Sequence, residues 1–212
     1  IPLRLVGSEM CIRDRDSLAY MMCLLVLGVG ALVLAYCARY FKSDAQGIGP
    51  FAAQLVAFAG AMFGLVTADD LMVLFVFWEI TSVLSFLLIS YSRTKLAARR
   101  AALQALIITT AGGLAMLVGL LMLGNAAGTF RISGVLEAAP ELLGSTTVDV
   151  ALVLILAGAV SKSALFPTHF WLPAAMAAPT PVSAYLHAAA MVKAGIYLCL
   201  LYTSDAADDT PC

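Results

Sequence analysis

The chain has 212 residues, of which 62% are hydrophobic and only 12% are charged, with a formal net charge of −1. Its mean hydropathy is +0.98, whereas charged residues make up about a quarter of a typical soluble domain, so the composition excludes an ordinary soluble protein. The small net charge gives no indication of a nucleic-acid partner. Several stretches of roughly 20 apolar residues predict an all-α, polytopic transmembrane helical bundle.

Six apolar segments are predicted to form the membrane helices. They are residues 18–40, 51–66, 71–91, 103–124, 148–166 and 182–202. Basic residues lie at the end of the first segment and after it, at Arg39 and Lys42, and after the third segment between Arg93 and Arg100, whereas Asp69 and Asp70 follow the second. Loops after alternate helices share one side of the membrane, so the positive-inside rule places the Arg93–Arg100 loop in the cytoplasm.

The segment between the fifth and sixth predicted helices is apolar but interrupted by proline. Four prolines fall between Pro167 and Pro181, and proline removes a backbone donor and disfavours continuous helix. Phe170 and Trp171 make this segment too apolar for a solvated loop. A discontinuous helix fits both facts, and such backbone is tolerated at membrane depth only where protein or a water-filled cavity covers it. Discontinuous helices often carry the ion sites of transporters.

The candidate functional residues are ionisable side chains inside the predicted membrane helices, namely Glu79, Lys162, His187 and Lys193. A charge at the bilayer centre costs roughly 2.5 to 3.5 kcal/mol on insertion scales, and such residues usually mark a proton or ion path. Lys162 lies close before Pro167, whose missing N–H leaves a backbone carbonyl free for other partners. A buried lysine is a suitable reversible proton carrier, and histidine titrates near neutral pH.

Each of these residues also has a plain structural interpretation. Glu79 is compatible with a protonated carboxyl that bonds a neighbouring helix, and Lys162 with a side chain that snorkels to the interface. His187 is compatible with a histidine bonded to a carbonyl, and His169 is expected at the interface. The five cysteines have no CxxC spacing, so no disulfide framework or zinc site is predicted. No nucleotide, catalytic, haem or iron–sulfur motif is present, and no catalytic residue, metal or cofactor is predicted.

The sequence around these charges resembles the antiporter-like subunits that respiratory complex I shares with Mrp-type cation/proton antiporters. The matching strings are FVFWEITS at residues 75–82, SKSALFPTHFWLP at 161–173, APTPVSAYLH at 178–187 and AMVKAGIY at 190–197. Within this family the similarity favours the large A-type subunit of Mrp-type Na+/H+ antiporters, because many complex I relatives have a non-basic residue at the position of Lys193. The L-type membrane subunit of complex I is the alternative.

The resemblance covers residues 18–201 and implies a partial antiporter-like transmembrane domain that contains the first inverted repeat of a longer protein. Residues 1–17 and 202–212 have no counterpart in the family and are expected to be non-native sequence, which we exclude from the fold prediction. The family relationship also implies a location in the cell membrane, with the lipid bilayer and other antiporter-complex membrane subunits as partners.

For the ionisable residues, the resemblance implies a proton relay. Glu79 pairs with Lys162 of the broken helix, and His187 and Lys193 continue the path toward a second half-channel. The implied function is exchange of Na+ (or K+) for protons by a transporter subunit rather than an enzyme. The alternative is a proton-pumping, non-redox subunit of NADH:quinone oxidoreductase, and a purely structural membrane scaffold is the third hypothesis.

Overall fold

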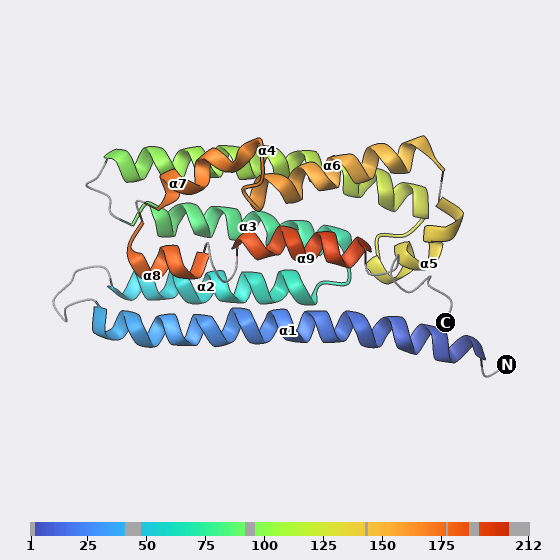
Figure 1. Ribbon diagram of the computed structural model, residues 1–212, viewed down its shortest axis with the longest axis horizontal. Helices are drawn as coiled ribbons and strands as arrows, with labels where there is room; N and C mark the ends of the chain where they lie inside the picture. Colours follow the sequence, from blue (N-terminus) through green and yellow to red (C-terminus); the bar gives the residue numbers. More distant parts are fainter. Residues whose placement is uncertain are drawn as a thin grey trace.

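The structure is a computed structural model that describes residues 3–40, 48–91, 96–142, 144–176, 178–186 and 191–203. The helices are α1 (Leu3–Tyr40), α2 (Ile48–Thr67), α3 (Leu71–Ile89), α4 (Leu96–Ala127), α5 (Ile132–Leu142), α6 (Thr146–Lys162), the 3₁₀ helix η1 (Thr168–Phe170), α7 (Trp171–Ala175), α8 (Thr180–Ser183) and α9 (Met191–Thr203). Figure 1 shows the long helices lying side by side along one axis, with the end of α1 and the starts of α2 and α4 at the same end of the bundle.

The predicted all-α membrane bundle is confirmed. In the part of the chain that the structure describes, five segments are long and apolar enough to span a membrane, namely Leu18–Tyr40, Gly49–Thr67, Leu71–Ile89, Ala98–Ala127 and Thr180–Cys199. The remaining predicted span, the fifth at residues 148–166, corresponds to α6, which has 17 residues and ends at Lys162 instead of continuing to residue 166. Helix α1 begins at Leu3, upstream of the predicted start at residue 18; that residues 1–17 and 202–212 are non-native stays a prediction.

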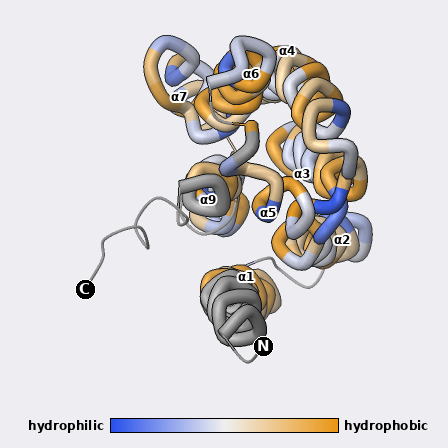
Figure 2. Tube along the Cα trace, turned by 90° about the vertical axis from the view of Figure 1, so that its right-hand side faces the viewer, coloured by the Kyte–Doolittle hydropathy of each residue, from blue (hydrophilic) through white to orange (hydrophobic). Residues whose placement is uncertain are grey.

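Figure 2 shows many hydrophobic residues along α4 and α6, and the exposed side chains of the bundle include many large apolar ones. Large apolar side chains are widely exposed, among them Leu32 at 71%, Ile107 at 66% and Val153 at 65%. In water such a surface would be a strong aggregation liability. It suits the hydrocarbon core of a bilayer, where helices satisfy their own backbone hydrogen bonds.

The start of α3 is fixed by two kinds of contact. The Asp70 carboxylate caps the helix by accepting hydrogen bonds from two backbone N–H groups of its first turn, as expected of aspartate at this position. The adjoining backbone pairs with the segment before α5, because Leu71 N donates to Phe130 O and Ile132 N donates to Asp69 O, both at 2.9 Å. These contacts fix the position of α3 along the bundle axis, and with it the position of every polar residue further along this helix.

The predicted break after the fifth helix is present. Helix α6 ends at Lys162, and Ala164 has a φ of +53°, the left-handed conformation that commonly ends a helix. The chain then continues through η1 and α7, which lies beyond the end of α6 and beside α4 (Figure 1). Trp171 is fully buried, and its indole N–H donates to the carbonyl of Ser161 at 3.0 Å. An aromatic side chain from beyond the break therefore satisfies a carbonyl at the end of α6.

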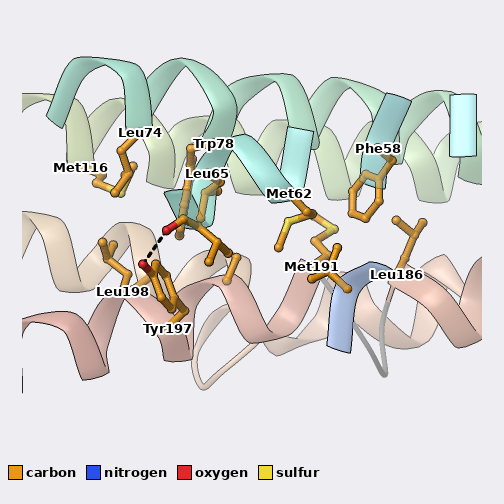
Figure 3. Close-up of a cluster of buried hydrophobic side chains, with 14 of the residues drawn as sticks. Phe58, Met62, Leu65, Leu74, Trp78, Met116, Leu186, Met191, Tyr197 and Leu198 are labelled. Carbon is orange, nitrogen blue, oxygen red and sulfur yellow. Dashed lines mark hydrogen bonds between the residues drawn. The ribbon is translucent and has the colours of Figure 1, made fainter. Parts of the chain in front are cut away.

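Helix α9 returns into the bundle beside α2 (Figure 3). The hydroxyl of Tyr197 donates to the backbone carbonyl of Val66 at 2.8 Å. Around this bond the close-up shows buried apolar side chains from both helices, including Leu65, Met62 and Met191. In the same way, the hydroxyl of Tyr185 donates to the carbonyl of Val26 on α1 at 3.0 Å. Two tyrosines thus tie the segment after the break to the first two helices.

We predict that Tyr197→Phe lowers the free energy of unfolding by about 1 kcal/mol, because it deletes one buried hydrogen bond between α9 and α2 while keeping the ring. Thermal unfolding in detergent measures the change. The matched control is Tyr20→Phe, at a tyrosine that is 70% exposed. Equal unfolding midpoints for the two variants would show that this hydroxyl does not stabilise the bundle.

Candidate functional site

The side chain of Lys162 is fully buried between α6 and α3. Its Nζ donates to the backbone carbonyl of Trp78 at 2.6 Å, to Oγ1 of Thr81 at 2.6 Å and to Oγ of Ser82 at 3.2 Å. A lysine ammonium has three N–H donors, so these three neutral oxygens satisfy all of them. The indole ring of Trp78 lies 4.3 Å from Nζ, measured to the ring centroid, in the range of a cation–π contact. The lysine therefore points into the bundle rather than snorkelling to its surface.

The three acceptors belong to one polar stripe on an otherwise apolar helix. Residues separated by three and four positions share a helix face, and Trp78, Thr81, Ser82 and Ser85 are all buried on α3. The hydroxyls of Thr81 and Ser82 donate to the carbonyl of Trp78, at 2.7 and 3.2 Å. Because their protons are directed at the helix backbone, their lone pairs are left to accept from the ammonium.

Glu79 is half-buried and lies beside this stripe, against α4. Its Oε1 is buried without a hydrogen-bond partner among the described residues, as is the indole nitrogen of Trp78. No ion pair joins Glu79 to Lys162 in the part of the chain that the structure describes, where the ammonium donates to neutral oxygens only. At an effective dielectric constant near 20, two unit charges 4 Å apart interact by about 4 kcal/mol, and the energy halves when the distance doubles. An interaction between this carboxyl and the ammonium is therefore one through space rather than by contact.

Two consecutive glycines of α4 make room for the polar side chains. A Cβ atom at Gly112 would overlap the Ser161 hydroxyl, and a Cβ atom at Gly113 would overlap Oε1 of Glu79. Ser161 immediately precedes Lys162 on α6, whereas Glu79 comes from α3. The missing side chains on α4 thus allow close approach of both helices that carry the site, as small residues do at membrane helix interfaces.

The other predicted residues are placed as follows. Lys193 is half-buried on α9, a helix joined to the end of α6 by a hydrogen bond of 3.0 Å from Ser163 Oγ to the carbonyl of Val192. His187 lies outside the described residues. His169 is exposed and stacks on Phe166 with ring centroids 6.0 Å apart; its interfacial position stays a prediction. Within the described ranges, no group of three or more His, Cys, Asp or Glu residues is placed to hold a metal ion.

The structure brings Glu79 and Lys162 into one polar region but adds partners that the sequence prediction missed. Thr81 and Ser82 bind the ammonium directly, and Gly113 accommodates the carboxyl. A signal for the first two exists in the sequence, because two hydroxyl residues follow Trp78 at helical spacing in a run of apolar residues. The role of Gly113 depends on which helix faces Glu79, and spacing along the chain does not specify that.

Comparison with known proteins identifies the class of this bundle. Residues 68–209 match the family described as NADH:quinone oxidoreductase/Mrp antiporter, transmembrane. The chain belongs to this family, which makes it a multi-pass membrane protein.

The individual relatives are components of antiporters. The chain is 48% identical over 183 residues to the A/B-type subunit of the probable K(+)/H(+) antiporter of Rhizobium meliloti, covering 86% of this chain and 18% of the relative. It is 47% identical over the same length to the A-type subunit of the Na(+)/H(+) antiporter of Alkalihalophilus pseudofirmus, covering 86% and 23%. A chain in the structure of the Mrp complex from Dietzia sp. DQ12-45-1b superposes with a TM-score of 0.81 at 45% identity, covering 86% of this chain and 20% of that one. The chain thus spans about a fifth of the length of these relatives.

We predict that Gly113→Ala destabilises the bundle by about 1 to 3 kcal/mol, because the added methyl group displaces the Glu79 carboxyl or separates α3 from α4. The control is Gly60→Ala, since nothing lies within 4 Å of a Cβ at that position; it is expected to be neutral or to stabilise α2 by up to about 1 kcal/mol. Thermal unfolding in detergent measures both. A Gly113→Ala variant as stable as Gly60→Ala would contradict the close approach of Glu79 to α4.

Proposed function

We propose that this chain is part of the proton-translocating membrane subunit of a monovalent cation/proton antiporter, of the large A type, exchanging Na+ (or K+) for protons. The observation that carries the proposal is the fully buried Lys162, whose ammonium is held by neutral oxygens with an acidic side chain on the same neighbouring helix. An ionisable residue held at this depth in a membrane bundle is usually functional. The family of the chain supports the same assignment.

In the proposed mechanism, Lys162 takes up a proton from one side of the membrane as its amine becomes an ammonium. The negative charge of Glu79 favours that charged form, since opposite charges stabilise each other at short range. When the charge of Glu79 is neutralised or moves away, this stabilisation is lost and the proton is released. His187 and Lys193 then pass it laterally, toward the half-channel that the family relationship implies outside this chain.

The proposal extends to partners and location. The match to a chain of the Mrp complex supports assembly with other antiporter-complex membrane subunits in the cell membrane. The exposed Arg99 and Arg100 at the start of α4 belong to the basic loop that the positive-inside rule assigns to the cytoplasm. The end of α1 and the start of α2 lie at the same end of the bundle (Figure 1), so the proposal assigns these to the cytoplasmic side as well.

The second candidate is a proton-pumping membrane subunit of NADH:quinone oxidoreductase, because the matched family includes that enzyme. Lys193, and the antiporter names of relatives at 46–48% identity, favour the antiporter. The chain itself is then a transporter component that performs no bond chemistry. The neighbouring genes distinguish the two candidates, because an antiporter subunit is expected beside other antiporter subunits and the alternative beside redox subunits.

We predict that Lys162→Ala in the full-length subunit, assembled in its complex, lowers cation/proton exchange by at least about tenfold, the size of effect expected when a proton-transfer group is removed. Exchange is measured in inverted membrane vesicles with a pH-sensitive dye and added NaCl or KCl, and co-purification of the partner subunits verifies assembly. Arg99→Ala is the control, since it removes an exposed cation from the same subunit. Exchange retained by an assembled Lys162→Ala complex would refute the proposed role and favour the structural scaffold.

A further inference from the structure

The protonated form of Lys162 is bound without direct contact with a counter-ion among the described residues. All three donors of its ammonium are directed at oxygens of α3 that carry no formal charge, at 2.6, 2.6 and 3.2 Å. The carboxyl of Glu79, only one position from Trp78 in the sequence, is turned to α4, where Oε1 occupies the space beside Gly113. The ammonium and the carboxyl therefore contact different groups, the first the oxygens of α3 and the second the backbone of α4.

We propose that Thr81 and Ser82 are positioning residues that hold the ammonium of Lys162 out of direct contact with the Glu79 carboxylate. This inference rests on the proposed function and adds a residue-level account of how the protonation of Lys162 stays reversible. A contact ion pair in a low-dielectric interior is tightly held, and leaving one partner unpaired there is costly. Neutral acceptors bind the ammonium while leaving the carboxylate to act from a distance.

The geometry of this acceptor set selects the protonated lysine. Thr81 and Ser82 each donate their hydroxyl proton to the carbonyl of Trp78, so toward the lysine they present lone pairs only. An ammonium offers three N–H groups to these three oxygens. A neutral amine offers two N–H groups and a lone pair, which leaves one oxygen facing a lone pair. Loss of the proton therefore removes one hydrogen bond between the lysine side chain and α3, and the side chain becomes freer to move.

The two hydroxyls that contact the lysine differ from the third hydroxyl of the same polar stripe. Ser85 is also buried, but its hydroxyl donates to the carbonyl of Ser82 at 2.7 Å, one turn further along α3. The charged residue of α3 is Glu79 and that of α9 is the half-buried Lys193, and α9 packs against α6. Ser85 thus provides a buried hydroxyl on the same helix that is suited as a control.

The test uses the full-length subunit in its assembled complex, with the variants Thr81→Val, Ser82→Ala and the double variant. Valine keeps the shape of threonine without the hydroxyl, whereas the variant Thr81→Ser keeps a hydroxyl at this position. Ser85→Ala is the matched control. We expect the double variant to lose about tenfold or more of its exchange rate and to shift its pH profile toward lower pH, since more acid is needed to populate an ammonium that has lost two acceptors. Thr81→Ser is expected to keep the wild-type pH profile, and Ser85→Ala to keep both rate and profile.

The outcomes separate this inference from the proposed function. If Lys162→Ala is inactive while the Thr81→Val and Ser82→Ala variants match Ser85→Ala in rate and pH profile, the positioning role is wrong and the proposed function stands. If Lys162→Ala retains exchange, the proposed function and this inference both fail. If the double variant does not assemble, the single variants decide, and an unchanged pH profile in both overturns the inference.

Discussion

The arrangement of this bundle depends on the burial of one lysine ammonium. An isolated charge in a low-dielectric interior is strongly unfavourable unless its donors are satisfied, and Lys162 has no exposed surface. Helix α3 satisfies these donors with a carbonyl and two hydroxyls, supplemented by the face of the Trp78 ring. The Trp78 carbonyl and the hydroxyls of Thr81 and Ser82 thus take the place of the water that an ammonium would have at the membrane surface.

The break after Lys162 is the second element of the same arrangement. A continuous helix would carry the chain past the lysine, whereas here the helix ends at that residue and the chain turns at Ala164. Trp171 then returns to bond the carbonyl of Ser161, and Ser163 bonds the backbone of α9. Backbone that leaves the helical pattern at membrane depth must be satisfied by protein, and these side chains do so. The break therefore places the lysine at a junction of α6, α3 and α9.

The sequence predicted much of this site for identifiable reasons. Charged residues in long apolar runs are rare, so Glu79 and Lys162 stand out without any structure, and prolines after Lys162 predict the discontinuous helix. The sequence prediction extended the fifth helix to residue 166, because the segment from residue 148 to 166 is mostly apolar and the first proline after it is Pro167. Helix termination at Ala164 is a matter of local backbone conformation and tertiary bonding, and apolar composition does not report it.

Composition and spacing alone determined the class of the protein, its approximate spans, the side with basic loops and the candidate charges, because these depend on local hydropathy and on the cost of placing charge in a bilayer. Only the tertiary structure decided which groups those charges face. The backbone hydrogen bond from Leu71 to Phe130 fixes the position of α3 along the bundle axis. Gly113 leaves space for the Glu79 side chain against α4. Contacts between helices far apart in the sequence thereby direct the carboxylate and the ammonium to different neighbours, and helical periodicity contains no information about such contacts.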